Sequence, residues 1–295
     1  MQSQVAAVIV THNSEQWITK TISSVLQQTQ APVNIVVIDD RSTDDTMKIL
    51  ERQQGLSPIP FTIQQASSSA RNITTRIAGN FVQGVQLAAN LGADLVVLGD
   101  HDDTWHPDRI KRQCALLDQQ PQALMVASDG NLVGSGAVGN SEGTIRGTFP
   151  VPSDWQGLTP VEQLRYTLRH SIATGGASML RPRHFAGGLE VPKGWLHDRW
   201  WSLVAVVRAG MIIDEGIVID YLVQAGQQVG LRTGSQTNSG AGRLAGAAPN
   251  PVQSLRKLGD LHERLRPLAQ SKQLRAQLSW VQLVRSLVSS IEVAS

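Results

Sequence analysis

Short apolar runs of strand length recur through the first hundred residues, and they constrain the fold more than any other feature of the chain. They lie at residues 5–10, 33–38, 61–63 and 95–98. Between them, apolar residues follow helical spacing at residues 18–26, 46–50 and 78–91. Unbroken apolar strands that alternate with helices are typical of a parallel sheet covered on both faces. The order therefore predicts an α/β fold with a mostly parallel sheet.

The bulk composition is that of an ordinary globular protein of 295 residues, with 41% hydrophobic and 17% charged residues. This composition excludes a disordered chain. The single cysteine, Cys114, excludes an intrachain disulfide and suits a reducing compartment. The first residues lack the basic start of a signal peptide, and no run of about 20 apolar residues is long enough for a membrane span. We therefore expect a cytoplasmic protein.

Beyond residue 130 the pattern loosens. Residues 134–153 are rich in Gly and Ser and predict a long loop. We expect a helix at 161–170, a strand at 175–180 and a helix at 195–208, with two further helices from residues 252 and 273. Composition then divides the chain into three parts: an α/β domain at 1–231, a Gly-, Ser- and Asn-rich linker at 232–253 and a basic helical tail at 254–295.

The tail carries a different charge from the rest of the chain. From residue 232 onward, nine Lys or Arg stand against three Asp or Glu, whereas residues 1–231 hold 17 basic and 21 acidic residues. Together with the helical apolar spacing from Leu255 to Leu268, this charge suits attachment to an anionic surface such as the inner face of a membrane. A homodimer interface and a merely solvated basic helix explain the same residues equally well.

Polar and acidic side chains gather directly after the apolar runs. Thr11 and Asn13 follow the first run, Asp39 and Asp40 follow the second, and the sequence GDHDD at 99–103 follows the fourth. In open parallel sheets, ligands bind at the carboxyl ends of the strands. The sequence therefore predicts that these side chains form one site.

The GDHDD stretch crowds three carboxylates around one histidine, so their repulsion must be relieved by a cation, a reaction or solvent. Asp-x-Asp at a strand end suits Mg²⁺ or Mn²⁺, which prefer carboxylate oxygens, keep several waters and share positions with phosphates. A solvent-exposed acidic turn explains the bare motif as well. Zinc is the weaker alternative, because His101 has no further His or Cys ligands at close spacing.

Four stretches in this order, VIVTHNSEQWITKTISSVLQQT, VVIDDRSTDDT, GNFVQG and VVLGDHDDTWHPDRI, resemble the inverting GT-A-fold glycosyltransferases of family 2. The chain is similar in particular to the rhamnosyltransferase-like branch, which favours Asp-x-Asp-Asp followed by Trp and Pro-x-x-Ile/Leu. The resemblance continues through residues 127–133, 174–177 and 196–201, over about 230 residues. It implies a Rossmann-like GT-A fold with a C-terminal helical extension, a nucleotide-diphospho-sugar donor and a divalent metal, Mn²⁺ or Mg²⁺.

The resemblance also implies roles in the donor site. Asp102 is expected to ligate the metal together with Asp100, which also contacts the ribose. Asp39 or Asp40 is expected to accept a hydrogen bond from the base of a UDP- or dTDP-sugar, since a carboxylate is a good acceptor for an imide N–H. The other donor-binding residues that the resemblance implies are Thr11, Asn13, Arg76, Asn80 and Asp103.

Asp198 is implied to be the catalytic base. An inverting transfer is a single displacement, in which one carboxylate deprotonates the acceptor hydroxyl while the diphosphate leaves from the opposite face. Without the family, Asp198 at a predicted helix start is better explained as an N-cap that also interacts favourably with the helix dipole.

Further residues are implied on the acceptor side. They are Gly175, Gly176, His197 and Trp200. Glycine allows a close approach of backbone to a sugar. The tryptophans at 195, 200 and 201 have two explanations: stacking on sugar rings, or packing of the base helix onto the sheet.

The chain departs from the branch after the predicted base helix. Members often carry a Tyr-Arg-x-His-Gly-like segment whose basic side chains reach the diphosphate, but residues 220–230 contain neither the arginine nor the histidine. Arg232 and Arg146 are the candidates to replace them. The Gln-x-x-Arg-Trp motif of processive members is also incomplete at Arg199-Trp200, which argues against a polymerising synthase.

Two other function classes are alternatives to a glycosyltransferase. A degenerate family member that binds a nucleotide or glycan without turnover is suggested by the missing basic residues. A nucleotidyltransferase usually begins with a Gly-rich phosphate loop, which Thr11-His12-Asn13-Ser14 does not resemble. The expected partners are the nucleotide-sugar and a glycan, lipid-linked or other anionic acceptor, as in the synthesis of cell-envelope polysaccharide.

Overall fold

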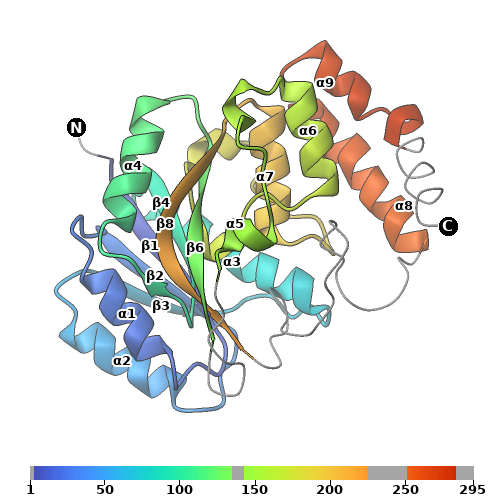
Figure 1. Ribbon diagram of the computed structural model, residues 1–295. Helices are drawn as coiled ribbons and strands as arrows, with labels where there is room; N and C mark the ends of the chain where they lie inside the picture. Colours follow the sequence, from blue (N-terminus) through green and yellow to red (C-terminus); the bar gives the residue numbers. More distant parts are fainter. Residues whose placement is uncertain (1–2, 135–142, 225–250, 284–295) are drawn as a thin grey trace.

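The computed structural model describes residues 3–134, 143–224 and 251–283. Within them, eight strands form one sheet in the spatial order β3-β2-β1-β4-β7-β6-β8-β5 (Figure 1). The strands are β1 (Val5–Thr11), β2 (Asn34–Asp39), β3 (Phe61–Gln65), β4 (Leu95–Asp100), β5 (Thr104–Trp105), β6 (Met125–Gly134), β7 (Ser178–Leu180) and β8 (Met211–Val223). Part of the predicted loop (135–142), most of the predicted linker (through 250) and the chain after 283 lie outside the described residues.

Strands β3, β2, β1 and β4 run parallel, as the alternating sequence pattern predicts. The apolar runs of β1, β2 and β4 are buried on both faces, which explains why they lack polar alternation, whereas only Phe61 of β3 is buried. Thr11 lies opposite Asp39 across β1 and β2, and Val10 lies opposite Asp100 across β1 and β4. The polar strand ends therefore meet at one edge of the sheet.

The other half of the sheet contains three strands, β5, β6 and β8, that the apolar runs do not predict, and β7, which confirms the strand expected at 175–180 for its last three residues. Strand β7 is antiparallel to both β4 and β6, β8 is parallel to β6, and β5 is antiparallel to β8. Strands β6 and β8 carry Asp129 and Asp214 within their length, so neither reads as an apolar run. The register between them is irregular around Asp129. The sheet as a whole is mixed but mostly parallel.

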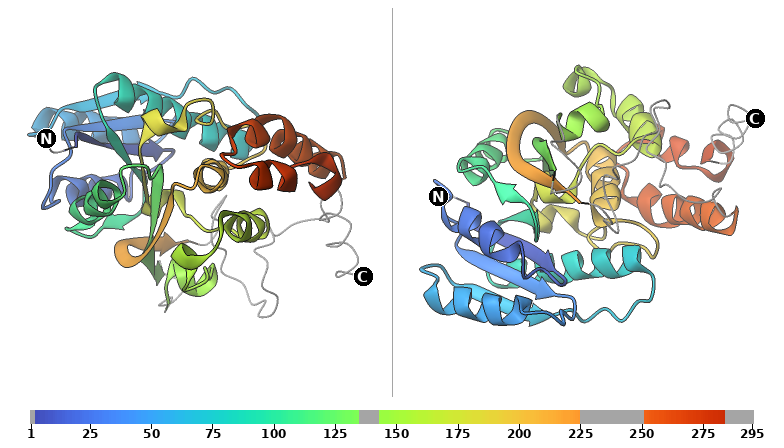
Figure 2. Two further views of the ribbon diagram at one scale, coloured as in Figure 1. Left: turned by 90° about the horizontal axis from the view of Figure 1, so that it is seen from above. Right: turned by 60° about the horizontal axis from the view of Figure 1, so that its bottom comes forward.

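Helices cover both faces of the sheet (Figures 1 and 2). One buried apolar cluster joins the sheet to α1 (Ile18–Leu26), α2 (Thr46–Leu56) and α4 (Arg109–Gln119). A second cluster, on the opposite face, involves α3 (Ile73–Asn90), α6 (Pro160–Arg169) and α7 (His197–Val207). The short α5 (Ile145–Thr148) lies against β6. The sheet thus separates two cores.

Helix α1 begins at Ile18, as the apolar spacing predicts, but α3 begins earlier than its apolar spacing indicates. Helix α3 begins at Ile73, five residues before the predicted start, and the Asn72 side chain caps it by accepting the Thr75 N–H at 2.9 Å. The cap satisfies a backbone N–H that has no partner within the helix. The apolar spacing does not show the cap and therefore does not show where the helix begins.

The C-terminal region is helical, as expected, but it is broken into short pieces. Helix α8 (Pro251–Asp260) continues into a π-helical turn at Leu261–Leu265, and α9 (Lys272–Gln277) follows. Leucines 261, 265, 274 and 278 are buried in the same cluster as α7. In the part of the chain that the structure describes, no helix has the length and apolar character needed to cross a membrane.

Candidate functional site

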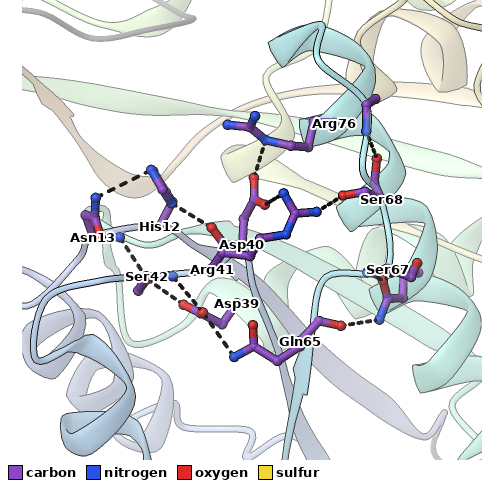
Figure 3. Close-up of polar contacts among 12 residues, drawn as sticks. His12, Asn13, Asp39, Asp40, Arg41, Ser42, Gln65, Ser67, Ser68 and Arg76 are labelled. Atoms are coloured by element: carbon purple, nitrogen blue, oxygen red, sulfur yellow. Dashed lines mark hydrogen bonds and ion pairs between the residues drawn. The ribbon is translucent and has the colours of Figure 1, made fainter.

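The turns after β1 and β2 form one corner of the site, residues 11–14 and 39–43, which we call the β1–β2 corner (Figure 3). Asp39 is fully buried there. Its carboxylate accepts hydrogen bonds from the Thr11 hydroxyl at 2.9 Å, the Ser42 hydroxyl at 2.6 Å and the Ser42 N–H at 3.0 Å. The Gln65 amide donates a fourth at 3.3 Å. Both carboxylate oxygens of Asp39 therefore accept hydrogen bonds that hold the corner together.

Asp40 has a different environment although it is the next residue. Arg76 Nε lies 2.6 Å from Asp40 Oδ2, and Arg41 Nη1 lies 3.7 Å from Oδ1 (Figure 3). The His12 ring lies 2.7 Å from the Asp40 carbonyl oxygen. Oδ1 is buried and has no hydrogen-bond partner within the described residues. Of the two candidates for a base acceptor, Asp40 is the one that retains a free acceptor atom.

Asn13 holds the two turns of the corner against each other. It adopts a left-handed backbone with φ 49°, which Asn tolerates better than most residues. Its N–H donates to the Ser42 hydroxyl at 2.8 Å, and its side-chain oxygen accepts the Thr43 N–H at 2.8 Å. Thr11 is fully buried on Asp39. Thr11 and Asn13, both predicted to bind the nucleotide-sugar, therefore shape the corner.

Three carboxylates after β4, those of Asp100, Asp102 and Asp103, make up the acidic cluster. Asp103 accepts the Leu222 N–H at 3.2 Å, and Asp102 accepts a 2.6 Å bond from the Gln224 amide. The second oxygen of Asp103 is buried and has no hydrogen-bond partner within the described residues. The end of β8 thus reaches across the sheet to the cluster.

Gly176 lies directly against the acidic cluster. A Cβ on this residue would come within 2.6 Å of Asp103 Oδ2 and 2.9 Å of Asp100 Oδ2. Such separations are below any ordinary contact, so the backbone reaches the carboxylates only because glycine has no side chain. Gly176, which was predicted to lie near the sugar acceptor, thus lies against residues that were predicted to bind the nucleotide-sugar donor.

Burial and mutual repulsion shift the titration of the cluster. Burial, then the charges of Asp102 and Asp198, raise the pKa of Asp100 to about 7. Burial, then Asp102 and Asp100, raise the pKa of Asp103 well above its usual range. Arg109, itself buried, opposes both shifts. An additional cation would favour the ionised carboxylates in the same way.

Arg109 is a buried counter-charge that sequence reasoning missed. Its guanidinium donates to the Leu98 carbonyl at 2.6 Å and lies 4.0 Å from the centre of the Trp105 ring. Burial lowers the pKa of Arg109 to about 9, while Asp103 and Asp100 act to raise it. The available signal was an arginine in the WHPDRI stretch, but only the packing of α4 under β4 places it there. Gln224 was missed for the same reason.

Asp198 lies in the first turn of α7, and its charge is one of the causes that raise the pKa of Asp100. Its carboxylate accepts the Arg199 N–H at 2.6 Å. The N-cap of α7 is Leu196, so the alternative explanation of Asp198 as the capping residue is wrong. A carboxylate in the first turn still interacts favourably with the helix dipole.

His197 and Trp200, predicted on the acceptor side, lie in the core instead. The His197 ring stacks on Phe81 with centroids 3.9 Å apart, and a Cβ on Gly175 would overlap it. Burial lowers the pKa of His197 to about 4. Trp200 is buried and donates its indole N–H to the Gly188 carbonyl at 3.1 Å. Neither ring presents a face on which a sugar could stack.

The other two tryptophans of this region also pack. Trp201 donates to the Leu189 carbonyl at 2.8 Å, and Trp195 donates to Asp260 at 2.9 Å. For the three tryptophans, packing is therefore the correct explanation.

Asn80, predicted near the donor, is fully buried one turn after Arg76, and its amide atoms have no hydrogen-bond partner within the described residues.

Arg146 does not replace the missing basic residues. Its guanidinium donates to the carbonyls of Ile172 at 2.7 Å and Ala127 at 2.9 Å, which ties it to the protein backbone. It borders a cavity of about 550 Å³ that also includes Asp129 and Trp155 but none of the predicted site residues. Arg232, the other candidate, lies outside the described residues.

The acidic cluster fits a hard divalent cation by its chemistry. Within the described ranges, no group of three or more His, Cys, Asp or Glu side chains is arranged to hold a metal ion. Carboxylates that repel one another, one of them with an unpartnered oxygen, nevertheless suit a cation that takes few protein ligands. Mg²⁺ and Mn²⁺ are such cations, since waters and phosphate oxygens fill their remaining positions.

Comparison with known sequences agrees with this geometry. The family model described as glycosyl transferase family 2 matches residues 6–186. The dTDP-rhamnosyl transferase RfbG of Shigella flexneri is 30% identical over 104 residues, which are 35% of this chain and 34% of that protein. An uncharacterised glycosyltransferase of Nostoc is 28% identical over 110 residues, 37% of this chain and 31% of that protein. The match thus spans about a third of the length of these curated relatives.

Solved structures share the fold. Staphylococcus aureus TarS 1–349 in complex with UDP-GlcNAc has a TM-score of 0.55 at 15% identity, covering 93% of this chain and 69% of that one. The complex of the same fragment with UDP has a TM-score of 0.52 at 16% identity, with 75% and 60% covered. At such identities the likeness concerns the fold alone, and it confirms the GT-A architecture that the sequence predicts.

Proposed function

This chain belongs to glycosyl transferase family 2, and from that premise we propose that it transfers a sugar from a UDP- or dTDP-sugar to an acceptor hydroxyl with inversion at the anomeric carbon. The observation that carries the proposal is the packing of Gly176 against the acidic carboxylates at the end of β4. A Cβ on Gly176 would come within 2.6 Å of Asp103 Oδ2 and 2.9 Å of Asp100 Oδ2. The charge of Asp198 on α7 also raises the pKa of Asp100, which supports Asp198 as the base of the same site.

The residues divide the work of donor binding. The free oxygen of Asp40 accepts the imide N–H of uracil or thymine, and Arg76 holds the Asp40 carboxylate in place. Asp102 and Asp100 would hold the divalent cation, and the Gln224 amide orients Asp102. When bound, the cation would neutralise charge on the departing diphosphate. Asp103, fixed by Leu222, faces the donor sugar.

Asp198 performs the proton transfer. Its carboxylate takes the proton of the acceptor hydroxyl as the hydroxyl oxygen bonds to the anomeric carbon. The bond from that carbon to the diphosphate oxygen breaks at the same time, and its electron pair leaves with the nucleotide. Gly176 allows the backbone to lie against the carboxylates of Asp100 and Asp103, where a side chain would not fit.

The test is nucleotide release from UDP- and dTDP-sugars with Mn²⁺ and a panel of acceptor glycans. Asp198→Asn should lower kcat by about 10²–10⁴-fold, the usual contribution of a general base, with donor affinity retained. Asp154→Asn, at an exposed aspartate, is the matched control. Full activity of Asp198→Asn would remove the assignment of the base.

A second candidate function is a nucleotide- or glycan-binding protein without turnover. The observation that favours it is the neutral Gln224 against Asp102, in the region where related proteins carry basic residues. Calorimetric titration with UDP and Mn²⁺, run beside the nucleotide-release assay, separates the two candidates. Binding without any release from any donor would favour the binding protein.

We further propose that the protein works at the cytoplasmic face of a membrane on a lipid-linked or other anionic acceptor of cell-envelope type. The described tail exposes Leu255, Trp280 and Val281, and the basic Arg256 and Arg266 are exposed as well. Truncation is a poor test because the leucines of this region belong to the core. Serine at the three apolar positions should abolish binding to anionic liposomes; a change of molecular mass instead would indicate a homodimer.

A further inference from the structure

The segment that leads into α7 is held from two sides. Gly194, in a left-handed conformation with φ 87°, donates its N–H to the Thr75 hydroxyl on α3 at 3.1 Å. The next residue, Trp195, donates its indole N–H to Asp260 Oδ2 on α8 at 2.9 Å. Asp198 follows three residues later. The approach to the predicted base is therefore tied to α3 on one side and to the C-terminal region on the other.

The contact with α8 is built around a buried ring. Trp195 is 6% exposed and meets Trp200 edge to face, with centroids 5.6 Å apart. Lys257 Nζ lies 5.1 Å from the centre of the Trp195 ring. A buried indole N–H needs a partner, and a carboxylate is among the stronger acceptors. Asp260 satisfies this need from the last residue of α8.

The same C-terminal region also holds the far end of α7. Gln270 donates its N–H to the carbonyl of Val207, the last residue of α7, at 3.0 Å. Between the two contacts, Leu261 and Leu265 are buried in the cluster that contains the α7 side chains. Residues 260–270 thus hold α7 at both ends, although they come more than 50 positions later in the chain.

We propose that Asp260 is a positioning residue, which acts through Trp195 to fix the first turn of α7 and with it the Asp198 carboxylate. The inference rests on the proposed function only where it concerns catalysis. A displacement of about 1 Å at a reacting group can cost on the order of 10²-fold in rate. A hydrogen bond that fixes the start of the base helix therefore contributes to kcat, whereas donor binding at Asp40 and Asp102 does not depend on it.

Two substitutions remove this bond from opposite ends. Trp195→Phe removes the donor but keeps an aromatic ring in the core, and Asp260→Ala removes the acceptor. Each should lower kcat roughly tenfold with the donor KM unchanged, and the double variant should be no slower than the single ones, since both remove the same bond. Asp260→Asn keeps a side-chain oxygen and should restore kcat to near the wild-type value.

Arg264→Ala is the matched control, because the exposed Arg264 forms an ion pair with Asp260 at 3.6 Å through Oδ1, whereas Trp195 donates its hydrogen bond to Oδ2. It should leave kcat unchanged. A loss of kcat in Arg264→Ala equal to that in Asp260→Ala, or additive losses in the double variant, would overturn the proposal.

Hydrogen exchange gives a readout that does not require activity. The amides of residues 194–200 should exchange faster in Trp195→Phe and Asp260→Ala than in the wild type and in Arg264→Ala. Unchanged exchange would overturn the proposal whatever the enzyme does. If exchange responds as expected but the wild type transfers no sugar, the positioning role stands and the proposed function fails.

Discussion

The β1–β2 corner and the acidic cluster both place neighbouring carboxylates at strand ends, but they treat the charge in opposite ways. In the corner, Asp39 accepts four hydrogen bonds and Asp40 pairs with two arginines. In the cluster, burial and the neighbouring acids raise the pKa of Asp100 and Asp103, and the buried Arg109 opposes this for both. One region is compensated by the protein itself, and the other is only partly so.

The difference indicates what each region is built to receive. A compensated corner is rigid before any ligand arrives and suits recognition of a neutral group such as a base. An undercompensated cluster stores repulsion that a divalent cation relieves, so its affinity for the cation is gained from the protein's own charges. We expect the two regions to respond differently to mutation, to pH and to metal.

The largest effect is expected in the acidic cluster. Asp102→Ala should lower the affinity for UDP in the presence of Mn²⁺ by about a hundredfold, because loss of a ligand weakens the metal and the metal holds the diphosphate. In EDTA, wild type and variant should bind UDP equally weakly. Titration calorimetry measures both conditions, and an Mn²⁺-dependent affinity that survives in Asp102→Ala would contradict the assignment.

The corner should separate stability from binding at two adjacent residues. Asp39→Ala should lower the free energy of unfolding by about 2–3 kcal/mol, because the donors it satisfies remain buried without a partner. Asp40→Ala should instead lower the affinity for UDP about tenfold, since one hydrogen bond to a charged acceptor is lost. Urea unfolding and calorimetry on both variants make the comparison, and reversed effects would exchange the two roles.

The metal-free protein should also show a pH dependence of stability that originates in the acidic cluster. The folded-state pKa of Asp100 is raised to about 7, against about 3.9 in an unfolded chain. Between these values the folded state retains a proton that the unfolded state releases, so the contribution of Asp100 to stability is present below pH 4 and declines as the pH rises to 7.

Urea unfolding in EDTA at pH 5 and pH 7.5 measures this decline. Asp100→Asn, which cannot titrate, should show a smaller decline, and Mn²⁺ should flatten the curve of the wild type because the cation replaces the proton. Identical pH dependence in wild type and Asp100→Asn would show that the carboxylate is not shifted as described.

The parallel half of the sheet is the part that sequence predicts best. Strands β1, β2 and β4 are covered on both faces, so their burial leaves a continuous apolar signal of the right length. Strands β6 and β8 carry Asp129 and Asp214, and these acids are tolerated because they bind Arg146 N–H and Arg112. Such partners are far away in sequence, and no local sequence pattern predicts them.

The candidate site follows the same division. Sequence order places Asp39, Asp40 and the acidic cluster at one edge, but it could not choose between Asp39 and Asp40, because the choice depends on the donors around each carboxylate. It assigned His197 and Trp200 to the acceptor side, although both rings pack inward from α7. It also missed Arg109 and Gln224, which reach the cluster only through the packing of α4 and the path of β8.

The sequence by itself determined the α/β class, the parallel strands of the first half and the gathering of acids at strand ends, since these depend on the period and length of apolar runs. Only the tertiary structure decided which carboxylate keeps a free oxygen, which rings are buried and that α8 ties down the start of α7. Those properties arise from contacts between residues distant in the chain, where hydrogen-bond partners and burial are set by packing and leave no local trace in the sequence.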